Sequence, residues 1–154
     1  MRRQARIGPR LIPADFYRKI VQVMPISCVD VIVSSRGKFL LCKRKNKPAQ
    51  GKWWPIGGRV FKNETLQDAV RRKVLEETGM SKMKIKKLLA AKETIFKDSA
   101  FGPSTHSVNS VFLVETNSKN LLRPDSQSSE LRWFSRIGGH WQSYVKDILR
   151  LAGF

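Results

Sequence analysis

The sequence predicts an α/β fold in which helices flank a mixed β-sheet. Two observations carry this prediction. Apolar and β-branched runs alternate along the chain with segments of helical periodicity, and no segment is repeated or of low complexity. The chain has 154 residues, of which 41% are hydrophobic, and this is the size of one ordinary domain with a substantial core. We therefore expect a single domain over residues 1–154.

The first third of the chain predicts a helix followed by a β-hairpin. Pro13 and an acid precede apolar residues at helical spacing, so residues 1–25 should form an N-terminal arm with a short helix. Strands are predicted over residues 26–33 and 38–44, joined by a Ser-Arg-Gly turn. Residues 46–59 contain several glycines and prolines, which predict a loop.

The rest of the chain predicts one central helix, three strands and a final helix. Asn63 is the expected N-cap of the central helix, apolar residues then recur every four positions from Leu66 to Val74, and Gly79 should end it. Strands are expected over residues 85–96, 106–116 and 131–134. Residues 141–151 have helical periodicity with a polar outer face.

The charge of the chain predicts a polyanionic partner. Thirty Lys and Arg residues against twelve Asp and Glu give a net charge of +18, and residues 31–63 contain basic side chains but no acid. Nucleotide phosphates or nucleic acid would both satisfy this charge, and a basic, well-solvated surface is the alternative interpretation.

Composition also indicates where the protein acts. No window is apolar enough to cross a membrane and the N-terminus is not a secretory signal, so we expect a soluble cytoplasmic protein without a membrane partner. Cys28 and Cys42 flank the expected turn and could face one another across the hairpin. In a cytosolic enzyme, two reduced core thiols are favoured over a disulfide.

The central helix carries charged residues on the face that should be apolar. On a helical wheel Glu77 falls within the stripe of Leu66, Val70 and Val74, and Lys73 lies beside it. Burying a carboxylate without compensation is costly. Two explanations stay open: an ion pair between Lys73 and Glu77 at a wet edge of the core, or a cation site that stabilises the buried charge.

The groups around this helix suit a metal and a phosphate. Glu76 lies next to Glu77, and the pair can offer several oxygens to Mg²⁺ or Mn²⁺. The Gly57-Gly58 pair lets backbone groups approach a phosphate and lets a carbonyl point at the metal. Arg72 can orient Glu76, and Arg59 can clamp a phosphate.

Residues 57–80 resemble the Nudix box, G-x5-E-x7-R-E-U-x-E-E-x-G-U. The match covers every position except that Lys73 replaces the first Glu after Arg, and it rests on Gly58, Glu64, Arg72, Glu76, Glu77 and Gly79. The resemblance implies an α/β/α sandwich with a mixed β-sheet and a magnesium-dependent hydrolase of nucleoside diphosphates linked to another moiety. It also implies that the Gly57 carbonyl, Glu76 and Glu77 bind the metal, with Glu64 in support.

Flanking segments are similar to the GDP-mannose mannosyl hydrolase subfamily, which also lacks the acid at the position of Lys73. The likeness covers most of the chain to about residue 134; its segments are residues 15–16, 29–33, 36–44, 46–51, 57–60, 64–66, 122–127 and 132–133. It implies a nucleotide-sugar substrate, with attack at the sugar carbon that releases GDP and the hexose. It further implies Gln127 as a metal ligand, Arg44 and Arg59 on the diphosphate, Asp30 near the nucleotide or sugar, and a homodimer.

The match to that subfamily fails at three positions. Ser128 follows Gln127 where the general-base histidine is expected, Ser107 replaces a tyrosine, and Glu76 is present where an acid is usually missing. His106 could be a base or a substrate contact, although a lone histidine is more often structural.

Two further alternatives stay open at this stage. Trp53 and Trp54 could stack on a base or pack the loop onto the core. A rival function for the whole chain is a Nudix domain that has lost catalysis and binds nucleotide or RNA through its basic surface. Nucleic acid is therefore a second, less favoured partner.

Overall fold

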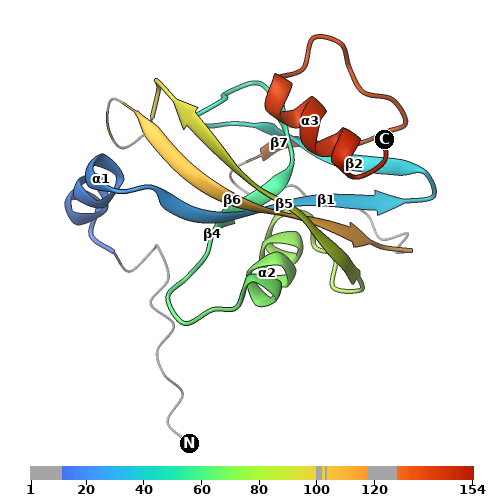
Figure 1. The fold of residues 1–154 in the computed structure, drawn as a ribbon, viewed down its shortest axis with the longest axis horizontal. Coiled ribbons are helices and arrows are strands. Elements are labelled where there is room, and N and C mark those ends of the chain that lie inside the picture. The colour runs from blue at the N-terminus through green and yellow to red at the C-terminus, as the bar shows by residue number, and fades with distance from the viewer. Residues whose placement is uncertain (1–11, 100–101, 103, 118–127) are drawn as a thin grey trace, which may run out of the picture.

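The structure is a computed structural model that describes residues 12–99, 102, 104–117 and 128–154. Within these residues the chain forms three helices and seven strands (Figure 1). The helices are α1 (Ala14–Val23), α2 (Leu66–Thr78) and α3 (Ser143–Leu151). The strands are β1 (Ile26–Ser35), β2 (Lys38–Arg44), β3 (Trp53–Trp54), β4 (Ile56–Arg59), β5 (Lys84–Phe96), β6 (Thr105–Glu115) and β7 (Ser128–Phe134).

The described strands form one mixed sheet. β1 runs parallel to β6 and antiparallel to both β2 and β4. β5 pairs with the outer side of β6, while β3 and β7 pair with β2, all antiparallel. The mixed sheet that the sequence predicts is therefore confirmed.

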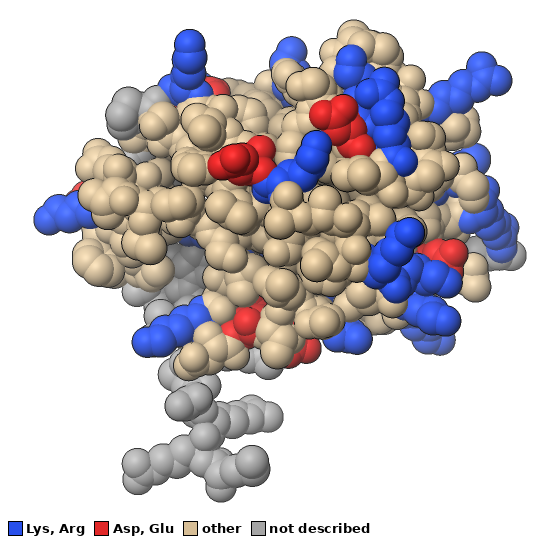
Figure 2. Space-filling view, in the orientation of Figure 1, with Lys and Arg blue, Asp and Glu red and all other residues tan. Residues whose placement is uncertain are grey.

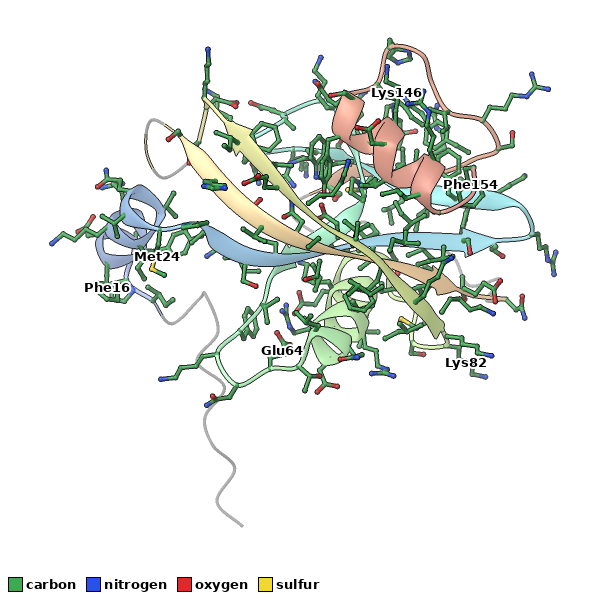
Figure 3. The ribbon with its side chains drawn as sticks, in the orientation of Figure 1. Phe16, Met24, Glu64, Lys82, Lys146 and Phe154 are labelled. Atoms are coloured by element: carbon green, nitrogen blue, oxygen red, sulfur yellow. The ribbon has the colours of Figure 1, made fainter. Side chains whose placement is uncertain are left out.

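Helices α2 and α3 lie on opposite faces of this sheet (Figure 1). Figure 3 shows Glu64, just before α2, on one side of the sheet, and Lys146 and Phe154 of the α3 region on the other. Successive residues of a strand point to opposite faces, and in β1 both Val31 and Ile32 are fully buried. Helices must therefore cover both faces of β1, which is the centre of the core.

The turn between β1 and β2 forms as predicted, but the two cysteines do not face each other. Arg36 and Gly37 have φ values of 49° and 73°, as in the two-residue turns that match the twist of a hairpin. The expected approach of Cys28 to Cys42 is wrong, because β1 pairs with β2 only near the turn and with β4 over residues 28–31. Neither cysteine forms a disulfide, and Cys42 is buried whereas Cys28 is half-buried.

Two local predictions before α2 are wrong. The expected loop over residues 46–59 contains β3 and β4, and β4 forms despite its glycines because residues 28–31 of β1 offer it a free backbone edge. The expected N-cap, Asn63, instead lies in a turn with a φ of 63°. Thr65 caps the helix, and its side-chain oxygen accepts a hydrogen bond from the N–H of Asp68 at 3.1 Å.

The remaining elements agree with the sequence. Helix α1 and strands β5, β6 and β7 overlap the segments predicted for them. Helix α2 ends at Gly79, which adopts a left-handed φ of 76° and donates its N–H to the carbonyl of Leu75. Helix α3 begins two residues later than expected, because buried Trp141 belongs to the turn that precedes it.

The surface is strongly basic. Figure 2 shows Lys and Arg side chains spread over the visible face, with several acidic side chains next to them. Among the described residues, Lys86 pairs with Glu115 and Lys92 pairs with Asp147. None of the helices described is long and apolar enough to cross a membrane.

Candidate active site

The last turn of α2 brings two carboxylates to one place. Glu76 is half exposed, whereas Glu77 is buried, as its position in the apolar stripe predicts. A helix C-terminus carries partial negative charge, so anions there are destabilised. The pair therefore needs cations close by.

The ammonium group of Lys73 supplies one of these cations. Its Nζ lies 2.8 Å from Oε1 of Glu77 and 3.4 Å from Oε2 of Glu76. Only 13% of the Lys73 side chain and 6% of the Glu77 side chain are exposed. The lysine stem lies against Gly58, where an added Cβ would come within 2.8 Å of Lys73 Cε. Of the two explanations that the sequence left open, the ion pair is present.

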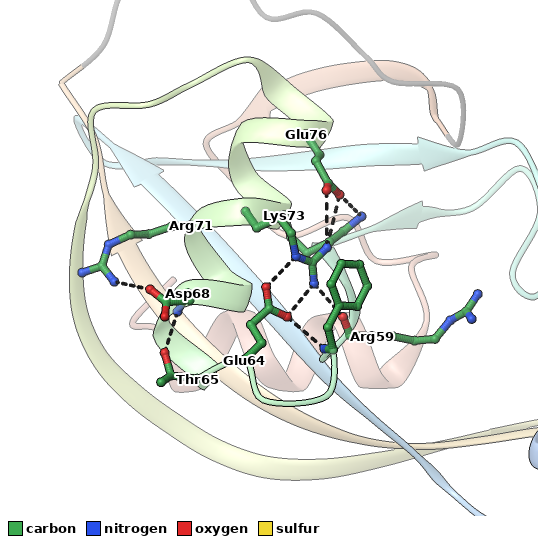
Figure 4. A network of polar contacts seen from close by, with 9 residues as sticks. Arg59, Glu64, Thr65, Asp68, Arg71, Lys73 and Glu76 are labelled. Carbon is green, nitrogen blue, oxygen red and sulfur yellow. Dashed lines mark hydrogen bonds and ion pairs between the residues drawn. The ribbon is translucent and has the colours of Figure 1, made fainter. Parts of the chain in front are cut away.

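Arg72 joins the loop before α2 to the helix. Figure 4 shows the network of polar contacts in which Arg59, Glu64 and Glu76 take part. The Arg72 guanidinium donates to both oxygens of Glu64 at 2.7 and 2.9 Å, to the carbonyl of Arg59 at 2.8 Å, and to Glu76 at 3.3 Å. It also stacks on the ring of Phe61, whose N–H donates to Glu64. Burial alone would lower the pKa of Arg72, but the bonds to Glu64 outweigh it and raise that pKa. Glu64 thus positions Arg72.

Asp30 is a buried carboxyl group on the other face of the sheet, the face that α3 covers. Asp30 of β1 lies opposite Gly57, where an added Cβ would come within 2.3 Å of its Oδ1. The hydroxyl of Tyr144, on α3, donates a hydrogen bond to Asp30. Burial raises the pKa of Asp30 to about 6, although Tyr144 and Arg44 oppose the shift. No pattern in the sequence pointed to Tyr144, which lies 114 residues from Asp30 along the chain.

The two arginines expected on a diphosphate lie at the ends of β2 and β4, two strands that both pair with β1. Arg44 ends β2 and donates from Nε to the carbonyl of Pro48 at 2.7 Å. Arg59 ends β4, and its guanidinium carbon lies 3.9 Å from the centre of the Tyr17 ring on α1. The guanidinium group of each arginine therefore has a neighbour within the protein.

The other predicted site residues are more widely spread. His106 is the second residue of β6, and its Nε2 lies 3.0 Å from Oε2 of Glu93 on β5. Ser128 is buried on β7 and pairs in register with Arg44. Gln127 lies outside the described residues.

The tryptophans of the basic segment pack within the protein. Trp54 is buried and stacks on Tyr144, with ring centres 5.4 Å apart. Trp53 packs edge-on against Phe134 and lies near the cationic group of Arg132. The packing interpretation of these side chains is therefore confirmed.

The oxygen donors near α2 are of the kind that binds a hard divalent cation. Glu76 and Glu77 offer carboxylate oxygens, and the Gly57 backbone adds a carbonyl on the adjacent strand, which are the donor types that Mg²⁺ and Mn²⁺ prefer. The part of the chain that the structure describes contains no cluster of three or more His, Cys, Asp or Glu side chains suited to a metal. Among the described side chains, the carboxylate pair that Lys73 contacts is the candidate for binding a cation.

A mixed sheet between helices, with paired carboxylates on the helix that follows a glycine-rich strand, defines an α/β protein of the Nudix class. The chain belongs to the NUDIX domain family, whose model matches residues 24–137. It is 37% identical to the Low-salt glycan biosynthesis protein Agl8 of Haloferax volcanii, over 96% of this chain and 95% of that protein. It is 31% identical to an ADP-ribose pyrophosphatase of Methanocaldococcus jannaschii, over 88% of this chain and 80% of that protein.

Solved structures agree with this assignment. A MutT NUDIX hydrolase from Burkholderia pseudomallei superposes with a TM-score of 0.67 at 27% identity, covering 83% of this chain and 98% of that one. A MutT protein from Methanosarcina mazei Go1 superposes with a TM-score of 0.68 at 22% identity, covering 85% and 96%, and shows the fold alone. The expected Nudix fold, with a mixed sheet between helices, is confirmed.

Proposed function

We propose that the chain is a divalent-metal-dependent Nudix hydrolase that cleaves a nucleoside diphosphate sugar, with a GDP-mannose-like compound as the first candidate. One observation carries the proposal: α2 brings Glu76 and Glu77 together beside the glycine strand β4, with Arg72 bound to Glu76. The comparisons support hydrolysis of nucleoside diphosphate derivatives. The names of two relatives, a glycan biosynthesis protein and an ADP-ribose pyrophosphatase, both concern sugar compounds.

In this proposal Glu76, Glu77 and the Gly57 carbonyl hold Mg²⁺ or Mn²⁺, with Gln127 as a further ligand. When bound, the cation would neutralise charge that develops on the diphosphate. Arg72 keeps the Glu76 carboxylate in place, because it is itself held by both oxygens of Glu64. The chain's own contribution is thus a carboxylate pair with a fixed orientation.

The substrate is proposed to lie across the edge of β4. Arg44 and Arg59 would bind the diphosphate, and cations aimed at a departing diphosphate stabilise the transition state more than the ground state. Asp30 and His106 would contact the nucleotide or the sugar. Burial keeps the Asp30 pKa near 6, so this carboxyl can serve as a donor or an acceptor close to neutral pH.

A product assay tests the function. Purified protein with Mg²⁺ and a panel of nucleoside diphosphate sugars, including GDP-mannose and ADP-ribose, should release product, and Glu77→Gln should lose at least about a hundredfold in kcat/KM. Free sugar plus NDP indicates attack at carbon, whereas sugar phosphate plus NMP indicates attack at phosphorus. Failure of every substrate, with Glu77→Gln no different from the parent, would contradict the enzyme proposal.

The contact between Lys73 and Glu77 favours one alternative function. A Nudix domain whose carboxylates are neutralised by its own lysine could bind nucleotide or RNA through its basic surface without catalysis. Such binding should weaken steeply with salt and persist in Glu77→Gln. Metal-dependent turnover that is lost in Glu77→Gln excludes this alternative.

A further inference from the structure

The position of Lys73 bears on how the carboxylate pair can accept a metal. Its Nζ contacts Glu77 at 2.8 Å and Glu76 at 3.4 Å, so the ammonium lies between the two groups that would bind a cation. Figure 4 shows Lys73 directed toward Glu76 at the end of α2. A lysine at this point supplies one positive charge where a metal would supply two.

An ammonium and a metal cannot both occupy this position. A magnesium ion binds carboxylate oxygen at about 2.0–2.1 Å. If the ion shared the Glu77 oxygen with Lys73, the two cations would lie within about 5 Å of each other at a site with little solvent, where repulsion is poorly screened. Metal binding therefore requires Lys73 to leave the pair.

The surroundings of Lys73 allow such a movement. Its stem lies across Gly58, which has no side chain to block it, and the nearby Glu76 carboxylate is half exposed. A lysine stem has four flexible carbons, so the ammonium can swing outward while the stem keeps its contacts. In contrast, Arg72 is tied to Glu64 and to the Arg59 carbonyl and has no such freedom.

We propose that Lys73 is an internal competitor for the metal site, which keeps Glu76 and Glu77 neutralised in the metal-free protein and lowers the affinity of the pair for divalent cations. This inference rests on the proposed metal-dependent function. It means that the protein is folded without metal and that metal binds only above a concentration that Lys73 sets. Removal of the ammonium should therefore tighten metal binding.

Direct metal titration tests the inference without any substrate. The metal-free parent, Lys73→Met and Arg71→Met are each titrated with Mn²⁺, and free Mn²⁺ is followed by electron paramagnetic resonance. Arg71 is the matched control because it is an exposed cation on the same helix that pairs with Asp68. Lys73→Met should bind Mn²⁺ at least about tenfold more tightly than the parent, and Arg71→Met within about twofold of it. Glu77→Gln in the Lys73→Met background should abolish the tight site.

Equal Mn²⁺ affinity in Lys73→Met and Arg71→Met would overturn the inference and leave the hydrolase proposal standing. The absence of Mn²⁺ binding in all variants would overturn both proposals. If Lys73→Met does not fold without metal, Lys73→Gln keeps a polar side chain and is titrated in its place, with the same expected tightening. A thermal melt provides a second readout, because Mn²⁺ should raise the Tm of the lysine variant more than that of the parent.

Discussion

Lys73 Nζ lies 2.8 Å from Glu77 Oε1, and both side chains are nearly excluded from solvent at the C-terminal end of α2. Their spacing of four residues lets the two side chains meet on one face of the helix. The helix dipole disfavours the carboxylate at this end, and the lysine offsets that cost. The stability of the metal-free protein should therefore depend on the two residues jointly.

A double-mutant cycle measures this dependence. In metal-free buffer, Lys73→Met leaves the Glu77 carboxylate without its ammonium, and Glu77→Gln leaves the ammonium without its carboxylate, so each should destabilise the protein. The double variant removes both charges and should be more stable than the sum of the single losses implies, by about 1–3 kcal/mol. Urea denaturation of the four proteins gives the coupling energy. Strict additivity would mean that the contact contributes nothing to stability.

Arg72 offers a second prediction, because it makes paired bonds that lysine cannot reproduce. Arg72→Lys loses one of the two bonds to Glu64 and the bond to the Arg59 carbonyl, and should lower the free energy of unfolding by about 2 kcal/mol. Arg71→Lys is the matched control, since Arg71 is exposed, and it should change stability by less than about 0.5 kcal/mol. Chemical denaturation measures both. Equal effects of the two substitutions would show that the paired hydrogen bonds of Arg72 do not contribute to stability.

The sequence predicted elements whose cause is local. The helix end at Gly79, the Arg36-Gly37 turn and the burial of Glu77 all follow from neighbouring residues, and all are confirmed. The predictions were wrong or incomplete where contacts between distant chain segments decide the structure. Strand β4 exists because β1 offers it a pairing edge, although its composition is that of a loop. The bond of Tyr144 to Asp30 likewise depends on how α3 packs against the sheet.

In the candidate site, too, contacts along one helix could be predicted and contacts between distant segments could not. Spacing along α2 was enough to place Lys73, Glu76 and Glu77 near one another. It could not show that Glu64 is held by Arg72, because that pair crosses from the loop to the helix. Contacts between different segments of the chain leave no periodic pattern in the sequence, whereas contacts along one helix do.

Asp30 predicts a pH dependence of stability. Burial raises its pKa from an ordinary 3.8 to about 6, so between these values the folded protein binds more protons than the unfolded chain. The contribution of Asp30 to stability is therefore greatest below about pH 4 and is lost as pH rises to about 6, by roughly 3 kcal/mol in total. The difference in unfolding free energy between the parent and Asp30→Asn, measured from pH 4 to pH 7, should fall by most of this amount. A difference that stays constant or rises with pH would contradict the raised pKa of Asp30.

Gly57 should tolerate no side chain, because its neighbours across the strand are too close. A Cβ at Gly57 would come within 2.3 Å of Asp30 Oδ1 and 2.4 Å of the Val29 carbonyl oxygen. The carbonyl belongs to the backbone of central strand β1 and cannot move without breaking strand pairing, so Gly57→Ala should cost about 2–3 kcal/mol. Gly139→Ala is the control, since no heavy atom lies within 4 Å of its added Cβ, and it should change stability by less than about 0.5 kcal/mol. Urea denaturation compares them, and a Gly57→Ala protein as stable as Gly139→Ala would mean that β4 can move away from β1.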